Sequence, residues 1–284
     1  MTIASREVPT PYGTFHIESA GQGAPVLFIH GGTASAREWR PVLPLLAEHA
    51  ACVAIDRLGC GLSDRSARGY DRATLTASLF SLADALGWDQ FAVVGQSFGG
   101  FWALSMALSQ PQPARINGLV VVNGVGGPMS EDELGAWQAR RQRRQQQRPV
   151  DTETAIEQTM QEIFADPGRV PASFRDDLRF QMAHAAAGQF EAVASEFETL
   201  AQAPYAELRL PTLVVWGEAD AMIPLERGRR LAAAIPGARF VGLPGVGHTC
   251  QVEAPAAFAD ALAPFLDALP RPVTAGGGGG GTGD

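Results

Sequence analysis

The sequence predicts an α/β protein in which a mostly parallel central sheet is flanked by helices and an all-helical segment is inserted between two strands. Three observations predict this fold class. Short apolar runs alternate with helix-forming stretches along most of the 284 residues, as in a parallel sheet covered on both faces. One run turns directly into a helix at the pentapeptide from Gly95 to Gly99. Between residues 127 and 206 the strand-like runs stop and helical spacing remains.

Composition narrows the class of function. The chain is 46% hydrophobic with a net charge of −8, which is typical of a globular protein and does not favour nucleic-acid binding. We find no signal peptide and no apolar run long enough to span a bilayer. We therefore expect a cytoplasmic protein that acts on a small molecule, without a membrane or nucleic-acid partner. A homodimer remains an open alternative to a monomer.

Cofactor signatures are missing from the sequence. It has neither a P-loop nor a GxGxxG dinucleotide motif. Cys52, Cys60 and Cys250 lack metal-ligand spacing, so we expect three free thiols and no metal. We expect the protein to work without a cofactor.

The predicted sheet defines one functional edge. We expect a hairpin near residues 14–18 and buried strands at residues 25–29, 52–55, 91–94, 119–122, 212–216 and 239–243. Helices are expected at residues 39–48, 74–86, 101–109, 225–235 and 255–269. Ligands of such sheets bind beyond the carboxyl ends of the strands. His30, Asp56, Ser97 and Asn123 follow strands and are therefore expected at the same edge.

The domain organisation follows from the same pattern. Residues 1–126 and 207–271 form the predicted core, and residues 127–206 form a helical cap with helices near 129–148, 152–164 and 190–200. Residues 272–284 are a Gly-rich tail that we expect to be disordered. The basic block at residues 138–148 is interpreted as a solvated helix face.

The pentapeptide Gly95-Gln96-Ser97-Phe98-Gly99 has the context of a nucleophile elbow, between a strand and a helix. A nucleophile that points out of a tight turn needs neighbours without a Cβ two residues before and two after. Gly95 and Gly99 meet that need. The alternative is that Ser97 is an ordinary helix N-cap.

A serine nucleophile needs a base, and a histidine base needs an acceptor that fixes its tautomer. Asp220 and His248 follow Ser97 in that order, and each lies on a loop after a predicted strand. Each has a simpler interpretation, since Asp220 could cap the next helix and His248 could be a loop residue. Glu218 is a second carboxylate close to Asp220.

With these motifs together, the chain resembles an α/β-hydrolase-fold serine hydrolase with a helical cap. The resemblance spans roughly residues 14–269 and includes His30-Gly31-Gly32, Gly95 to Gly99 and Gly247-His248. It implies Ser97 as nucleophile, His248 as general base and acid, and Asp220 as the acid that orients His248. It also implies an oxyanion hole formed by the backbone N–H groups of Gly32 and Phe98, with His30 supporting the loop. Some relatives carry the acid after the strand that here ends at Asn123, but an asparagine cannot supply the charge.

The substrate is less closely defined by the sequence. Candidate pocket walls are Trp39, Trp137, Met160 and Phe164, with Phe98 and Met182 beside them, and core packing is the alternative for each. Relatives that attack with Asp, the haloalkane dehalogenases and epoxide hydrolases, do not fit Ser97.

Our first hypothesis is hydrolysis of a small, largely apolar carboxylic ester, thioester or lactone through an acyl-enzyme on Ser97. The alternative is a carbon–carbon bond hydrolase that uses the same triad on a ring-fission or β-diketone substrate. Peptide cleavage at an N-terminal residue is a weaker alternative, because no acidic subsite for the amine can be placed. A ligand-binding protein that kept the fold without turnover would also carry these motifs.

Overall fold

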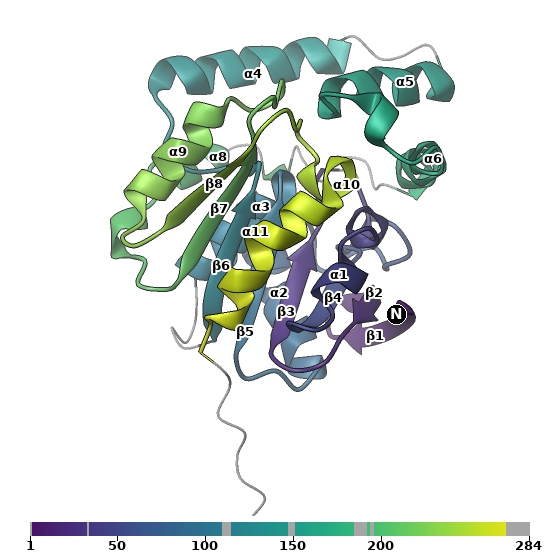
Figure 1. Ribbon diagram of the computed structural model, residues 1–284, viewed down its shortest axis with the longest axis vertical. Helices are drawn as coiled ribbons and strands as arrows, with labels where there is room; N and C mark the ends of the chain where they lie inside the picture. The colour runs from purple at the N-terminus through teal and green to yellow at the C-terminus, as the bar shows by residue number, and fades with distance from the viewer. Residues whose placement is uncertain are drawn as a thin grey trace, which may run out of the picture.

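The computed structural model describes residues 2–32, 34–109, 115–146, 151–184, 192–193 and 196–270. Its centre is an eight-stranded sheet in the order β1-β2-β4-β3-β5-β6-β7-β8 (Figure 1). The strands are β1 (Ala4–Thr10), β2 (Gly13–Ala20), β3 (Pro25–Ile29), β4 (Ala51–Ile55), β5 (Phe91–Gln96), β6 (Ile116–Val122), β7 (Thr212–Gly217) and β8 (Arg239–Leu243). The β1-β2 hairpin is antiparallel and β2 joins β4 antiparallel, whereas β4 to β8 pair in parallel. This confirms the predicted fold class.

Helices cover both faces of the sheet. They are η1 (Ala36–Trp39), α1 (Leu43–Leu46), α2 (Arg72–Ala85), α3 (Phe98–Leu108), α9 (Leu225–Ala234), α10 (Cys250–Glu253) and α11 (Pro255–Asp267). The helical stretch expected at residues 39–48 is confirmed only in part, because the chain forms a 3-10 turn that ends at Trp39 and a one-turn α-helix at Leu43–Leu46. Pro41 lies between these two elements and has no N–H to donate within a helix, whereas Pro44 lies in the first turn of α1, where a proline is tolerated.

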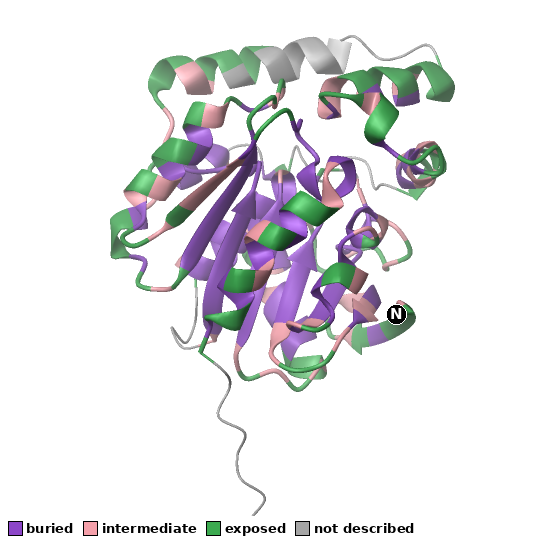
Figure 2. Ribbon diagram, viewed as in Figure 1, coloured by how far each residue is buried: buried purple, intermediate pink, exposed green. Residues whose placement is uncertain are grey.

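The core lies in two apolar layers, one on each face of the sheet. Along β5, Phe91 and Val93 point into the layer that also contains α2 and α3, whereas Ala92 and Val94 point into the layer with α1 and α11. This alternation is the two-residue period of a strand. All residues of β5 are buried, and the buried colour in Figure 2 runs through the central strands.

Between β6 and β7, the described elements are all helical. They are α4 (Glu131–Gln146), α5 (Thr152–Ile163), η2 (Pro167–Arg169), α6 (Phe174–His184), α8 (Glu196–Ala201) and η3 (Tyr205–Glu207). Figure 1 shows α4, α5 and α6 beyond one end of the sheet. The helix predicted at residues 190–200 lies partly outside the described residues, and the tail at 272–284 lies wholly outside them. The division into core and cap domains stays a prediction.

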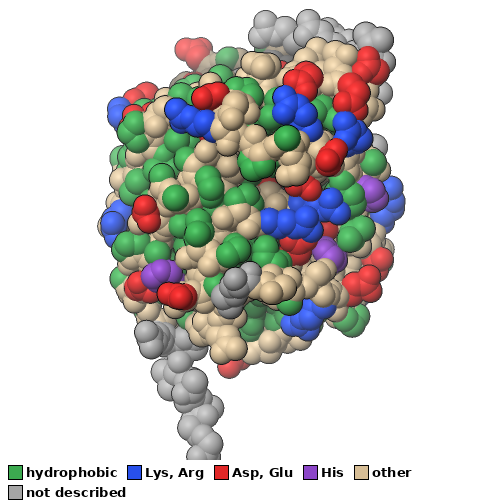
Figure 3. All heavy atoms as spheres, turned by 45° about the vertical axis from the view of Figure 1, so that its right-hand side comes forward, with side chains coloured by type: hydrophobic (Ala, Val, Ile, Leu, Met, Phe, Trp, Pro, Cys, Tyr) green, Lys and Arg blue, Asp and Glu red, His purple; other side chains and the backbone are tan. Residues whose placement is uncertain are grey.

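The surface carries charges of both signs. Figure 3 shows acidic and basic side chains intermingled on one face of the molecule. Ion pairs join Arg175 to Glu157 and Arg179 to Glu153 across helices α5 and α6. In the described part of the chain, no helix has the length and hydropathy needed to cross a membrane. The three cysteines are free, as expected, and all are buried.

Candidate active site

Ser97 has the backbone conformation of a strained turn. It stands between β5 and α3 with φ of +50° and ψ of −115°, a region that non-glycine residues rarely occupy. Its N–H donates to the Val122 carbonyl at 2.9 Å, and its own carbonyl accepts from Val125 at 2.8 Å. The end of β6 thus holds the strained residue in place. The ordinary N-cap interpretation lacks its hydrogen bond, because the Ser97 side chain makes no capping contact with α3.

The two glycines of the pentapeptide are required by space. A Cβ on Gly95 would lie 2.2 Å from the Gly99 carbonyl oxygen, and one on Gly99 would lie 2.1 Å from the Ile29 carbonyl oxygen. Neither approach is sterically possible, so α3 can start this close to β3 and β5 only with glycine at both positions. A Cβ on Gly31 would lie 3.4 Å from the Ser97 Cβ, which places the loop after β3 beside Ser97.

Asp220 and His248 form a buried hydrogen-bonded pair. His248 Nδ1 lies 2.8 Å from Asp220 Oδ2, and both side chains are almost fully buried. Because a carboxylate accepts, Nδ1 carries the proton and Nε2 is the nitrogen that can accept one. Burial alone would raise the pKa of Asp220, but hydrogen bonds from His248 and its other neighbours hold that pKa below its usual range. The pair is suited to orient a histidine base.

Asp220 also terminates its own turn. Its Oδ1 accepts backbone N–H groups of Met222 at 2.8 Å and Ile223 at 3.0 Å, so the capping role and the contact with His248 use different oxygens. Glu218, the competing carboxylate, is exposed and lies against Gly242 of β8. The geometry therefore favours Asp220 as the partner of His248.

Asn123 is a residue that the sequence analysis placed at this edge without a role. It is fully buried, with φ of +45°, directly after β6. Its Nδ2 donates to Asp220 Oδ2 at 2.7 Å, and its Oδ1 accepts from the Gly217 N–H at 3.2 Å and the Cys250 thiol at 3.0 Å. Asn123 and His248 thus contact the same oxygen of Asp220, and Asn123 helps to hold that carboxylate in place. Its position after a strand was the only signal in the sequence.

The backbone of His248 is held at both of its polar groups. Its N–H donates to the Ile163 carbonyl at the end of α5, at 2.8 Å. Its carbonyl accepts from Gln96 Nε2, in the pentapeptide, at 3.0 Å. Gln96 and Ile163 were not predicted as site residues, because neither contact leaves a local sequence signal.

The loop after β3 is supported by a buried polar group. His30 Nδ1 donates to the Gly31 carbonyl at 2.8 Å, and Nε2 accepts the Arg57 N–H at 3.0 Å, so the ring is neutral. Burial and the charge of Arg57 lower the pKa of His30, in keeping with that state. The Glu38 carboxyl group accepts the Gly31 N–H at 3.0 Å, and burial raises its pKa to about 8.

Arg57 contacts both residues predicted to form the oxyanion hole. Its Nη2 donates to the carbonyls of Gly31, at 3.0 Å, and of Gly32, and its guanidinium lies 5.0 Å from the centre of the Phe98 ring. The Gly32 backbone faces open space where a Cβ would be, so a ligand can approach it closely. Phe98 is the first residue of α3, so its backbone N–H belongs to the N-terminal turn of that helix.

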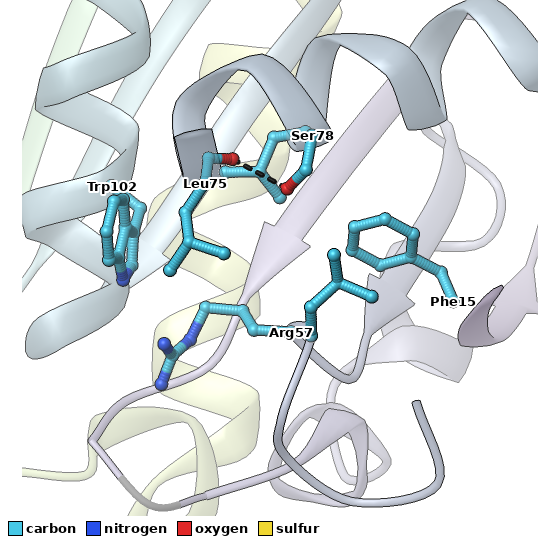
Figure 4. Close-up of a pocket in the computed structure, with 7 residues that line it drawn as sticks. Phe15, Arg57, Leu75, Ser78 and Trp102 are labelled. Atoms are coloured by element: carbon cyan, nitrogen blue, oxygen red, sulfur yellow. Dashed lines mark hydrogen bonds between the residues drawn. The ribbon is translucent and has the colours of Figure 1, made fainter. Parts of the chain in front are cut away.

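A small cavity lies beside Arg57 (Figure 4). Its volume is about 10 Å³, which is the space of a single water molecule and too little for a substrate. Ser78, on its wall, donates to the Leu75 carbonyl at 2.8 Å. The lining residues are Phe15, Arg57, Leu58, Leu75, Ser78, Leu79 and Trp102.

Among the predicted pocket walls, Trp39 lies in a different apolar cluster from Met160 and Phe164. Trp39 is fully buried, with its ring centre 5.1 Å from that of Phe28 and 6.1 Å from that of Phe258. Met160 and Phe164 belong to another apolar cluster, formed with Ile156, Val170, Phe174, Leu178 and Val252, against which Met182 also packs. The side chain of Trp137 lies outside the described part of the structure. Contact of any of these residues with a substrate stays a prediction.

Comparison with known proteins identifies the family. The family profile described as alpha/beta hydrolase fold matches residues 24–255. The chain belongs to the α/β hydrolase family. The match starts before β3 and ends at the start of α11, so it includes Ser97, Asp220, His248 and the residues that contact them.

Two curated relatives with at least 30% identity are named as hydrolases. The chain is 32% identical over 265 residues to a 2-hydroxymuconate semialdehyde hydrolase of Pseudomonas sp. (strain CF600), covering 88% of this chain and 89% of that protein. It is 30% identical over 269 residues to a 2-hydroxy-6-oxo-2,4-heptadienoate hydrolase of Pseudomonas putida, covering 89% and 92%. The family and these relatives show that the protein is an enzyme, as the sequence analysis predicted.

A solved structure shares the fold. The 2-hydroxy-6-oxo-6-phenylhexa-2,4-dienoate hydrolase of Rhodococcus sp. strain RHA1 superposes with a TM-score of 0.78 at 23% identity, covering 94% of this chain and 99% of that one. A membrane phospholipase A superposes equally well, with a TM-score of 0.79 at 23% identity, covering 93% and 86%. Structural likeness at this identity therefore reports the fold and does not select a substrate.

Proposed function

We propose that this enzyme hydrolyses a carbon–carbon bond in a 2-hydroxy-6-oxo-2,4-dienoate, the type of compound formed when an aromatic ring is opened. One observation carries the proposal: curated relatives at 30–32% identity over nearly the whole chain are named for substrates of this type. The ester hydrolysis that the sequence analysis put first has no such support among these relatives. The alternative that it kept is therefore the better hypothesis.

The chemistry needs a nucleophile, a base and donors for an oxyanion. In the 2-keto tautomer of the substrate, carbon 5 is conjugated to the 2-oxo group through a double bond, so carbon 5 can leave with an electron pair. Ser97 Oγ attacks carbon 6 while His248 Nε2 takes its proton. Gly32 and Phe98 N–H groups bind the developing oxyanion. The bond between carbons 5 and 6 then breaks, and its electron pair passes into the 2-oxo group.

The second half of the cycle restores the enzyme. The proton on His248 is returned to the departing dienolate, which leaves as a 2-hydroxypenta-2,4-dienoate. His248 then takes a proton from water, and the hydroxide attacks the acyl group on Ser97. The acyl group leaves as a carboxylic acid and Ser97 regains its proton. Asp220 keeps His248 in the tautomer with the proton on Nδ1 throughout.

The test compares two substrate classes in one preparation. Wild type and Ser97→Ala are assayed by loss of the dienol chromophore of 2-hydroxymuconate semialdehyde and by hydrolysis of p-nitrophenyl esters from acetyl to octanoyl. We expect rapid loss of the chromophore, reduced by roughly 10³-fold or more in Ser97→Ala. Efficient ester turnover with the chromophore untouched would contradict the proposal and restore the esterase hypothesis. Full activity of Ser97→Ala would remove Ser97 from the mechanism.

A further inference from the structure

Glu253 joins two segments that are far apart in the sequence. It is the last residue of α10 and is only 4% exposed. Its Oε2 accepts the Gly247 N–H at 2.8 Å and the Ala165 N–H at 3.2 Å, and its Oε1 accepts the Asp166 N–H at 2.9 Å. Gly247 directly precedes His248, whereas Ala165 and Asp166 follow α5. One buried carboxylate therefore binds the histidine loop to the helical insertion.

The two segments also touch through their backbones. The Ile163 carbonyl accepts N–H groups from His248 at 2.8 Å and Thr249 at 3.3 Å. A Cβ on Gly247 would lie 2.5 Å from the Ala165 nitrogen and 2.8 Å from the Ile163 oxygen. The two backbone segments therefore approach too closely to leave room for a side chain at position 247. Figure 1 places α10 at the end of the sheet that faces α5. The histidine loop and the end of α5 are thus in direct backbone contact.

We infer that Glu253 is a positioning residue for His248, acting through residues 163–166 of the helical insertion. The inference rests on the proposed role of His248 as base. Asp220 fixes one ring nitrogen and Gln96 fixes the carbonyl of His248, but the N–H depends on Ile163. Glu253 holds the segment that carries Ile163 against the loop. The location of Nε2 relative to Ser97 therefore depends on the seating of this segment.

Only an acceptor with two equivalent oxygens suits the position. All three groups that face the Glu253 side chain are N–H donors, and a carboxylate is acceptor-only. Glutamine would place an NH2 group against either Asp166 or the pair of Gly247 and Ala165, so one of the two contacts would be lost. Glutamine is nearly equal in size to glutamate, so Glu253→Gln should keep the packing but hold only one of the two segments, the histidine loop or residues 163–166.

The experiment measures how fast Ser97 is labelled by a fluorophosphonate, a reaction that needs the nucleophile and its base whatever the natural substrate is. A misplacement of about 1 Å costs about 10²-fold in such a step, so we expect labelling of Glu253→Gln to slow about 10- to 100-fold. Glu157→Gln, at an exposed ion pair on α5, is the matched control and should label at the wild-type rate.

Two measurements separate positioning from loss of folding. Glu253→Asp keeps both oxygens on a shorter chain and should label at an intermediate rate. Hydrogen exchange of Glu253→Gln should quicken at the amides of Gly247, Ala165 and Asp166 while amides of β5 and β6 stay protected. Labelling of Glu253→Gln at the wild-type rate, or faster exchange throughout the sheet, would overturn the inference. Wild-type protein that labels but leaves the dienol chromophore intact would instead contradict the proposed substrate.

Discussion

Asn123 offers a test of how the acid beside His248 is held. Asn123→Ala removes the Nδ2 donor that lies 2.7 Å from Asp220 Oδ2 and the acceptor for the Gly217 N–H. Losing a hydrogen bond to a charged group costs about 1.5–3 kcal/mol, and leaving a buried N–H without a partner costs about 1–3 kcal/mol. We expect the free energy of unfolding to fall by about 3–5 kcal/mol, a large share of the stability of a typical domain.

Asn123→Asp separates the donor from the acceptor. The new carboxyl keeps the acceptor for Gly217 but places an oxygen where the NH2 group was, close to Asp220. Two carboxylates at this distance share one proton, which raises the pKa of the pair in the folded protein. A group whose pKa is raised in the folded protein stabilises the fold at acid pH. That stabilisation is lost as the pH rises through the raised pKa. We therefore expect Asn123→Asp to have near wild-type stability at about pH 5. Its free energy of unfolding should fall by about 1–4 kcal/mol between that pH and about pH 8.

The assay is urea unfolding of wild type, Asn123→Ala and Asn123→Asp at both pH values, followed by tryptophan fluorescence. The stability difference between Asn123→Ala and wild type should change less between the two pH values than that of Asn123→Asp, because alanine adds no titrating group. A pH-independent deficit in Asn123→Asp, equal to that of Asn123→Ala, would refute the reasoning. Wild-type stability of Asn123→Ala would show that the amide does not hold Asp220.

Two further perturbations follow from the same geometry. Burial raises the pKa of Glu38 from 4.5 to about 8, so its contribution to stability is complete below about pH 4.5 and is lost as the pH rises through 8. Between about pH 5 and about pH 9, we expect the free energy of unfolding of Glu38→Gln, measured in urea, to fall less than that of wild type. The same pH dependence in both proteins would contradict this. Gly99→Ala should destabilise by about 2–3 kcal/mol, because its Cβ would lie 2.1 Å from the Ile29 oxygen. The control is Gly135→Ala in α4, where the space is open, and it should stabilise by about 0.4–1 kcal/mol; destabilisation of similar size in both would argue against crowding at Gly99.

The sheet could be predicted from the sequence because its signals are local. Each central strand is a short apolar run that ends in a small or polar residue, and the strands from β3 to β8 lie within a few residues of their predicted places. The edge hairpin was underestimated, because β1 and β2 are mostly polar or mixed and their pairing depends on contact with each other and with β4. Pro41 was visible in the sequence, yet its effect on the helical stretch predicted there was missed.

The tertiary structure decided what surrounds His248. Asn123 and Asp220 are 97 residues apart, and Ala165 and Glu253 are 88 apart, so no periodicity or motif links them. Which way a buried side chain points is also invisible in the sequence: Trp39 was a candidate pocket wall and lies between Phe28 and Phe258.

By itself, the sequence determined the fold class and the order of Ser97, Asp220 and His248, because strand ends and a strained Gly-x-Ser-x-Gly turn are written into neighbouring residues. Only the folded chain determined the partners of those residues, such as Gln96, Asn123, Arg57 and Glu253. The physical reason is that a buried polar group must find a hydrogen-bond partner, and packing brings that partner from anywhere in the chain.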